Sequence, residues 1–321
     1  MTEIEWTDET LNVFVGCSKV SDGCRNCYAI KQAYRNSVIA QTMSRPGRMQ
    51  YYKGLTQTKD DRVDWTGEVR FVPEALEIPL KWKKARRIFV NSMSDLFHES
   101  IPIEQIDQVF AVMALTLQHT YQVLTKRPER MLAYLQNAKN RVRIAAVDLG
   151  RATKTEHTDI ESCQWDWPPP NVWIGATVEN QKALENRARP LYQLHNRSWK
   201  TFYSVEPLLE NVELYLNHER VDWVIVGGES GQGARPFDLD WARSLIWQCK
   251  EAGVPVFMKQ LGANCVGTNT DGEILIGKRS NFHPVFANRA WTRLSDSKGG
   301  DINEWPKDLQ IREFPKEFCR V

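Results

Sequence analysis

"RIFVNSMSD", residues 87 to 95, decides the fold, because a short apolar run passes directly into polar side chains. Residues 87–92 are typical of a buried strand, and Ser92, Ser94 and Asp95 stand at its end. We predict further strands, each an apolar run followed by polar residues, at 12–16, 121–125, 171–178, 201–206, 222–229 and 254–260. The polar residues at their ends include Thr125, Lys126, Glu179, Glu206, Glu229 and Lys259.

Helical periodicity separates these strands. The predicted helices span 25–41, 73–84, 102–117, 127–137, 180–194 and 238–252. This alternation favours an α/β fold with a parallel sheet, which a doubly wound sheet or a β/α barrel would both satisfy. Polar strand ends favour the barrel, where such residues converge on one rim, and no dinucleotide fingerprint follows the first strand. We therefore predict a β/α barrel, partial or open.

The domain organisation follows from where the alternation stops. Residues 1–264 are predicted to form the barrel domain, and residues 265–321 a C-terminal extension that packs on it. Two insertions, 42–70 and 139–170, are longer than ordinary connections, so we expect each to be a lid or a binding loop.

The composition indicates a cytoplasmic protein with no membrane partner. The chain has 321 residues and a net charge of +2, too small to imply a partner. It contains no apolar run of the ~20 residues that a membrane helix needs, and its acidic N-terminus lacks the order of a signal peptide. In a reducing compartment, clustered cysteines are typical of metal sites rather than disulfides.

Three of the seven cysteines lie in "GCSKVSDGCRNCYA", residues 16–29. A structural zinc site would need a fourth ligand, from Cys163, Cys249, Cys265 or a histidine, and a nucleophilic cysteine would leave two thiols unexplained. A [4Fe–4S] cluster on Cys17, Cys24 and Cys27 would leave one iron for a ligand from outside the protein, and we favour this interpretation. The sequence indicates no role for Cys163, Cys265 or Cys319, and Cys249 is predicted to be a buried helix residue.

The cysteine stretch resembles the cluster loop of radical S-adenosylmethionine enzymes, although its first spacer has six residues rather than three. The resemblance implies that S-adenosylmethionine chelates the fourth iron and is cleaved to start radical chemistry, with an electron donor as partner. The aromatic residue that packs near the adenine in that family is replaced by Asn26, and Tyr28 follows instead.

The chain also resembles, nearly end to end, the phage Gp37/Gp68-like family of uncharacterised function, DUF5131. The stretches that carry this resemblance include "LTKRPERM", "IGATVENQ", "SVEPLL", "VGGESGQGARPFDLDWARSL", "FMKQLG" and "KGGDINEWPKDLQIREFP".

We assign the strand-end residues to two groups. Glu229, Lys259 and Lys126 are the predicted catalytic residues. The predicted cofactor-binding residues are Ser92, Ser94, Asp95, Tyr28, Glu179, Glu206 and Arg235. The competing interpretations are a helix N-cap at 92–95, a glycine turn at 227–235, and salt bridges that close the barrel.

Residues 31–62 carry seven cations and two carboxylates, interleaved with Tyr51 and Tyr52, which favours a nucleic-acid or nucleotide substrate or a small anionic one. We therefore expect a radical enzyme that abstracts hydrogen from a nucleotide or a nucleic-acid base. The alternative is a zinc-stabilised protein that binds nucleic acid or a partner without catalysis.

Overall fold

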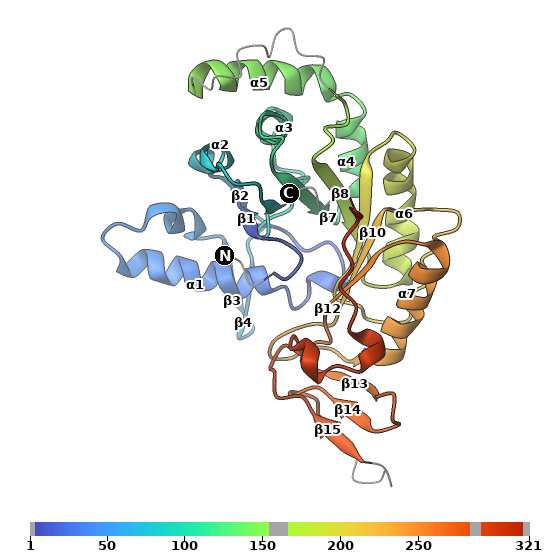
Figure 1. Cartoon of the computed structure of the whole chain (residues 1–321). Helices are drawn as coiled ribbons and strands as arrows, with labels where there is room; N and C mark the ends of the chain where they lie inside the picture. Colours follow the sequence, from blue (N-terminus) through green and yellow to red (C-terminus); the bar gives the residue numbers. More distant parts are fainter. Residues whose placement is uncertain (1–3, 154–165, 283–289, 317–321) are drawn as a thin grey trace.

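A computed structural model describes residues 4–153, 166–282 and 290–316. Within them, seven parallel strands form one sheet, which curls into a half-barrel (Figure 1). In spatial order the strands are β1 (Glu9–Leu11), β6 (Arg87–Val90), β7 (Thr120–Thr125), β8 (Val172–Thr177), β9 (Lys200–Val205), β10 (Trp223–Gly227) and β12 (Val256–Gln260). Because β1 and β12 do not pair with each other, the sheet stays open, and the prediction of an α/β fold with a partial barrel is confirmed at this level.

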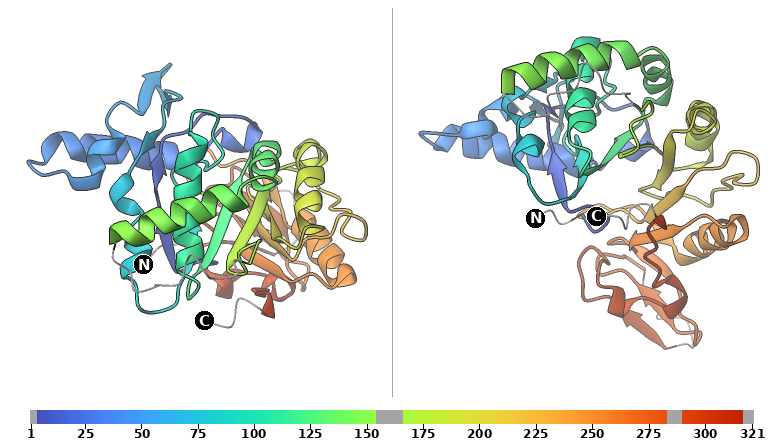
Figure 2. Two further views of the ribbon diagram at one scale, coloured as in Figure 1. Left: turned by 90° about the horizontal axis from the view of Figure 1, so that it is seen from above. Right: turned by 45° about the horizontal axis from the view of Figure 1, so that its top comes forward.

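Helices connect the strands and cover the convex side of the sheet (Figures 1 and 2). They are α1 (Tyr28–Thr42), α2 (Ile78–Lys81), α3 (Ile103–Leu115), α4 (Pro128–Leu135), α6 (Gln181–His195) and α7 (Leu239–Ala252). Where a helix was predicted over 73–84, the chain forms only a 3₁₀ turn, Pro73–Ala75, and the four residues of α2. None of the helices in the described ranges combines the length and apolar character needed to cross a bilayer.

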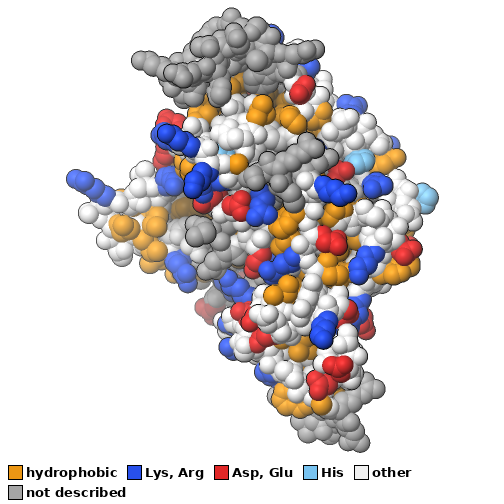
Figure 3. All heavy atoms as spheres, in the orientation of Figure 1, with side chains coloured by type: hydrophobic (Ala, Val, Ile, Leu, Met, Phe, Trp, Pro, Cys, Tyr) orange, Lys and Arg blue, Asp and Glu red, His pale blue; other side chains and the backbone are white. Residues whose placement is uncertain are grey.

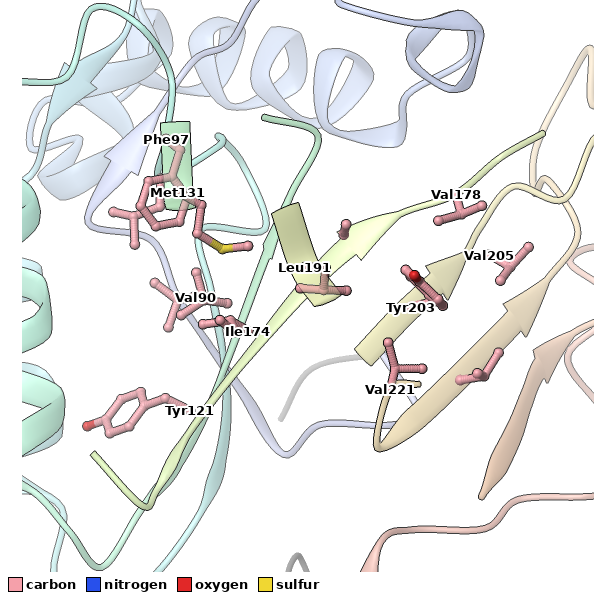
Figure 4. Close-up of a cluster of buried hydrophobic side chains, with 14 of the residues drawn as sticks. Val90, Phe97, Tyr121, Met131, Ile174, Val178, Leu191, Tyr203, Val205 and Val221 are labelled. Carbon is pink, nitrogen blue, oxygen red and sulfur yellow. The ribbon is translucent and has the colours of Figure 1, made fainter. Parts of the chain in front are cut away.

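Alternation along the strands divides the core into two layers. Side chains on the convex side, such as Val90, Tyr121, Ile174 and Tyr203, pack with the helices (Figure 4). Their neighbours point to the concave side, where aromatic rings fill the base of the half-barrel. This second cluster contains Trp6, Phe89, Trp173, Phe202, Trp223, Ile225 and Phe257.

The first strand lies earlier than predicted. Residues 12–16 were expected to enter the main sheet, but β1 ends at Leu11, and β2 (Phe14–Val15) pairs with β5 (Arg70–Phe71) in a separate two-stranded sheet. Asn91 causes the diversion, because its side-chain oxygen accepts hydrogen bonds from the backbone N–H groups of Val13 and Phe14.

The two insertions differ in structure. Residues 42–70 contain a 3₁₀ segment, η2 (Gly47–Tyr52), and a hairpin of β3 (Thr56–Lys59) and β4 (Arg62–Trp65) beside α1. Residues 139–153 form a helix, α5 (Lys139–Thr153), that packs on α3.

The C-terminal part forms its own small sheet and then returns to the half-barrel. Its strands are β11 (Phe237–Asp238), β13 (Cys265–Thr268), β14 (Ile274–Ile276) and β15 (Trp291–Arg293), followed by the 3₁₀ turns η5 (Ile302–Glu304) and η6 (Lys307–Leu309). The segment after η6 lies along the open edge of β12, where the Met258 N–H donates to the Ile311 carbonyl at 2.8 Å.

Candidate functional site

A pocket of about 220 Å³ lies on the concave side of the sheet, at the carboxyl ends of the strands. Its wall brings together eleven of the thirteen predicted site residues: Cys17, Cys24, Cys27, Tyr28, Ser92, Ser94, Asp95, Lys126, Glu206, Glu229 and Lys259. Residues 42–70 add Trp65 to the wall, whereas the described part of 139–170 adds none. Residues far apart in the sequence, from Cys17 to Lys259, therefore line one pocket.

The cysteine loop, residues 16–27, begins and ends at well-defined points. Gly16 adopts a φ of 93°, and a Cβ atom there would lie 2.2 Å from the Glu68 carbonyl oxygen. Only glycine fits this conformation and this close approach. The loop ends where α1 begins, since Cys27 is the residue immediately before the helix, which starts three residues later than the predicted span of 25–41.

Side chains from three strand ends hold this loop in place. The Arg127 guanidinium donates to Ser18 Oγ at 2.8 Å, and the Gly23 N–H donates to Glu179 Oε1 at 3.3 Å. Asn26 Nδ2 donates to Glu229 Oε2 at 2.8 Å. The loop that carries the three thiols is thus fixed along its length rather than only at its ends.

Glu179 and Arg235, the two predicted site residues that do not line the pocket, belong to this framework. Glu179 is fully buried and pairs with Arg187 at 2.6 Å. Burial opposes its ionisation, but Arg187 and Lys126 outweigh that effect and lower the pKa of Glu179. Arg235 pairs with Glu229 at 2.6 Å and also donates to the Asp22 carbonyl oxygen.

Glu229 is engaged on both carboxylate oxygens. Burial raises its pKa, but hydrogen bonds from Arg235 and Asn26 more than offset this, so the pKa lies below its usual range. A carboxylate held ionised by two donors is suited to orienting the cysteine loop rather than to transferring protons.

The Asp95 carboxylate also has hydrogen-bond donors on both of its oxygens. Its two oxygens accept hydrogen bonds from the backbone of Phe97 and Lys126, the Thr125 hydroxyl and the Arg127 guanidinium. This carboxylate therefore ties the end of β6 to the end of β7, and it positions Arg127 against the cysteine loop.

Two lysines and one glutamate present charge to the pocket. Lys126 Nζ lies 3.3 Å from the Thr177 hydroxyl, and Lys259 Nζ lies 3.3 Å from Glu206 Oε1. Ser204 donates to the other oxygen of Glu206 at 3.3 Å. Because these contacts are long, the lysines retain capacity to donate to an anionic ligand.

Asn91 is a site residue that the sequence did not reveal. It lines the pocket at 2% exposure and adopts a φ of 60°, which asparagine tolerates better than most residues. Its Nδ2 and the hydroxyl of Ser94 are buried without a hydrogen-bond partner in the described residues. Buried donors of this kind are normally satisfied, so both would be available to donate to a ligand in the pocket.

The surroundings of two of the thiols oppose their ionisation. Burial raises the pKa of Cys17 to about 12, with Asp95 adding to the rise and Arg127 opposing it. Burial likewise raises the pKa of Cys27, while Lys126 opposes it. A metal that replaces the thiol protons would hold these sulfurs as thiolates.

The described residues do not supply a closed single-ion site. Within these ranges, no group of three or more His, Cys, Asp or Glu side chains is placed to hold a metal ion. Cys249 and Cys265 are buried in α7 and β13 and do not line the pocket, and Cys163 and Cys319 lie outside the described residues. In a [4Fe–4S] cube each thiolate binds a different iron, so its cysteines surround the cube rather than converge on one ion.

The nucleic-acid interpretation of Tyr51 and Tyr52 does not fit their environment. Tyr52 is 8% exposed, and the half-buried Tyr51 donates its hydroxyl hydrogen to Glu74 at 2.9 Å. Tyr28 and Tyr34 on α1 are the exposed tyrosines of this region, at 51% and 46%.

Comparison with known proteins identifies the family and nothing closer. The family described as "Protein of unknown function (DUF5131)" matches residues 1–291. Searches of curated proteins and of solved structures found no match.

Proposed function

This chain belongs to the DUF5131 family, and we propose that it is a radical S-adenosylmethionine enzyme acting on a nucleotide or a nucleic-acid base. The observation that carries the proposal is that Cys17, Cys24 and Cys27 line one pocket at the carboxyl rim of a parallel half-barrel. Three soft ligands, with no fourth cysteine beside them in the described residues, fit a cluster that keeps one iron for an external ligand.

Two unpartnered donors support a cofactor beside the thiols. Asn91 Nδ2 and Ser94 Oγ lie at the end of β6 and would donate to the carboxylate of S-adenosylmethionine. A [4Fe–4S] cluster with bound S-adenosylmethionine supplies reductive cleavage of the sulfonium, which gives methionine and a 5′-deoxyadenosyl radical that takes hydrogen from a substrate.

The remaining pocket residues define the environment of that chemistry. Trp6, Phe89 and Leu124 line the pocket with apolar side chains from one hydrophobic cluster, which would disfavour water there. Lys126 and Lys259 approach from opposite parts of the rim and favour a negatively charged substrate, such as a nucleotide phosphate. Glu206 orients Lys259.

The test is anaerobic reconstitution with iron and sulfide, followed by incubation with S-adenosylmethionine and a strong reductant. We expect 5′-deoxyadenosine and methionine from the intact protein and none from Cys24→Ala. A colourless protein that retains stoichiometric zinc and forms no 5′-deoxyadenosine would support the alternative, a zinc-stabilised binding protein, and would overturn the proposal.

A further inference from the structure

One surface beside the pocket carries a run of positive charge that lies outside the pocket itself. Residues 23–59 contain seven cations and no carboxylate: Arg25, Lys31, Arg35, Arg45, Arg48, Lys53 and Lys59. All seven are exposed, and the described residues provide no ion-pair partner for any of them. Such a run attracts a polyanion along its length rather than a single small anion.

The outer face of α1 combines these cations with exposed rings. Successive residues turn by about 100° around a helix, so Tyr28, Lys31, Arg35 and Val38 lie within an arc of about 80°, with Tyr34 on its flank. Small side chains such as Ala29, Ala33 and Ala40 pack inward on the opposite side. We define the α1 face as Tyr28, Lys31, Tyr34, Arg35 and Val38.

The α1 face begins at the pocket and runs outward. Tyr28 lines the pocket, is 51% exposed, and donates its hydroxyl hydrogen to the Ser92 carbonyl at 2.9 Å, which fixes the ring at the mouth. From there α1 projects beyond the sheet (Figure 2), and hydrophobic side chains lie among Lys and Arg in this region of the surface (Figure 3). The 15 residues of α1 span about 21 Å, roughly the length of six stacked nucleotides of one strand.

We propose that the α1 face binds single-stranded nucleic acid and leads it to the pocket, so that the substrate of the proposed enzyme is a base within a strand. This inference rests on the proposed function for what happens in the pocket, but not for the binding itself. Rings interleaved with cations provide base stacking and phosphate contact together, and stacking requires unpaired bases. A membrane-surface helix would instead present a continuous apolar stripe of larger residues such as Leu, Phe and Trp.

The experiment is fluorescence anisotropy of the full chain with a labelled single-stranded oligonucleotide of about 12 nucleotides. Tyr34→Ala is expected to weaken binding about 5- to 150-fold, the loss of one stacked base. Lys31→Gln with Arg35→Gln is expected to reduce the slope of log K against log salt by about 1.4, at about 0.7 per phosphate contact. The matched control is the exposed pair on α7, Trp247→Ala with Lys250→Gln, which is expected to change neither quantity.

Three outcomes would overturn the inference. They are equal losses in the α1 and α7 variants, tighter binding to a duplex of the same sequence, or binding to phosphatidylserine vesicles without binding to the oligonucleotide. The assay needs no reductant and no S-adenosylmethionine. Oligonucleotide binding without 5′-deoxyadenosine formation would therefore contradict only the proposed function. Formation of 5′-deoxyadenosine without oligonucleotide binding would contradict only this inference.

Discussion

At the scale of single residues, Asn91 links the fold to the site. Its Oδ1 satisfies two backbone N–H groups that would otherwise be buried unpaired, and its Nδ2 points a free donor at the pocket. Because Oδ1 accepts hydrogen bonds from the backbone and Nδ2 is a donor toward the pocket, substitutions of Asn91 can separate the two roles.

We expect Asn91→Asp to keep the fold and weaken S-adenosylmethionine binding about 10- to 100-fold, since the acceptor survives and the donor is lost. Asn91→Ala should instead cost about 2–4 kcal/mol of unfolding free energy, because it leaves two buried donors unpaired. Calorimetric titration of the reconstituted protein and urea unfolding measure the two effects. Undiminished affinity in Asn91→Asp would contradict the role given to Nδ2.

The same scale shows what sequence reasoning can reach. The convergence of Lys126 and Lys259 was predictable because parallel strands end at a common rim. Cys17 lies at the same rim, although the strand before it, β2, is outside the parallel sheet. The role of Asn91 was not, because it depends on a positive φ at a position that the pattern assigned to a strand interior. The hydrogen bond from Asn26 to Glu229 was not predicted, because the two residues lie 203 positions apart in the sequence.

At the scale of elements, the cysteine loop depends on Gly16. Gly16→Ala is expected to displace the loop and to lower iron content after reconstitution, because the new Cβ would lie 2.2 Å from the Glu68 carbonyl. Gly47→Ala is the matched control, since Gly47 also has a positive φ, 55°, but has open space around it. Both variants carry backbone strain, so a loss confined to Gly16→Ala isolates the steric contact. Equal iron content in both would contradict the account.

Helices also differ in how clearly the sequence pattern predicts them. Helices α3, α6 and α7 lie within two residues of their predicted bounds, because each has a long periodic apolar face. Helix α5 was missed, since its inward stripe around Val142 and Ala146 is thin and the rest of 139–153 is strongly charged.

At the scale of the whole molecule, the half-barrel must protect the open edge of β12. The C-terminal segment pairs with that edge, and Phe314 packs its ring on Trp223 and Phe257 at centroid distances of 5.6 and 5.1 Å. An uncovered edge of this kind is a template for aggregation.

Phe314→Ala is therefore expected to lower the free energy of unfolding by about 2–3 kcal/mol and to promote aggregation. Phe282→Ala is the control, because Phe282 is 45% exposed and its loss should change stability by less than about 0.5 kcal/mol. Urea unfolding and size-exclusion chromatography provide the readouts. If the two variants prove equally stable, the C-terminal segment does not secure the edge.

The central claim is that Cys17, Cys24 and Cys27 together hold an iron–sulfur cluster, and iron content tests it most directly. After anaerobic reconstitution, the intact protein and Cys249→Ala are predicted to hold about four irons and as many sulfides per chain, and Cys24→Ala to hold almost none. Cys249 is a fitting control because it is fully buried in α7, outside the pocket. Equal iron content in Cys24→Ala and Cys249→Ala would contradict the claim.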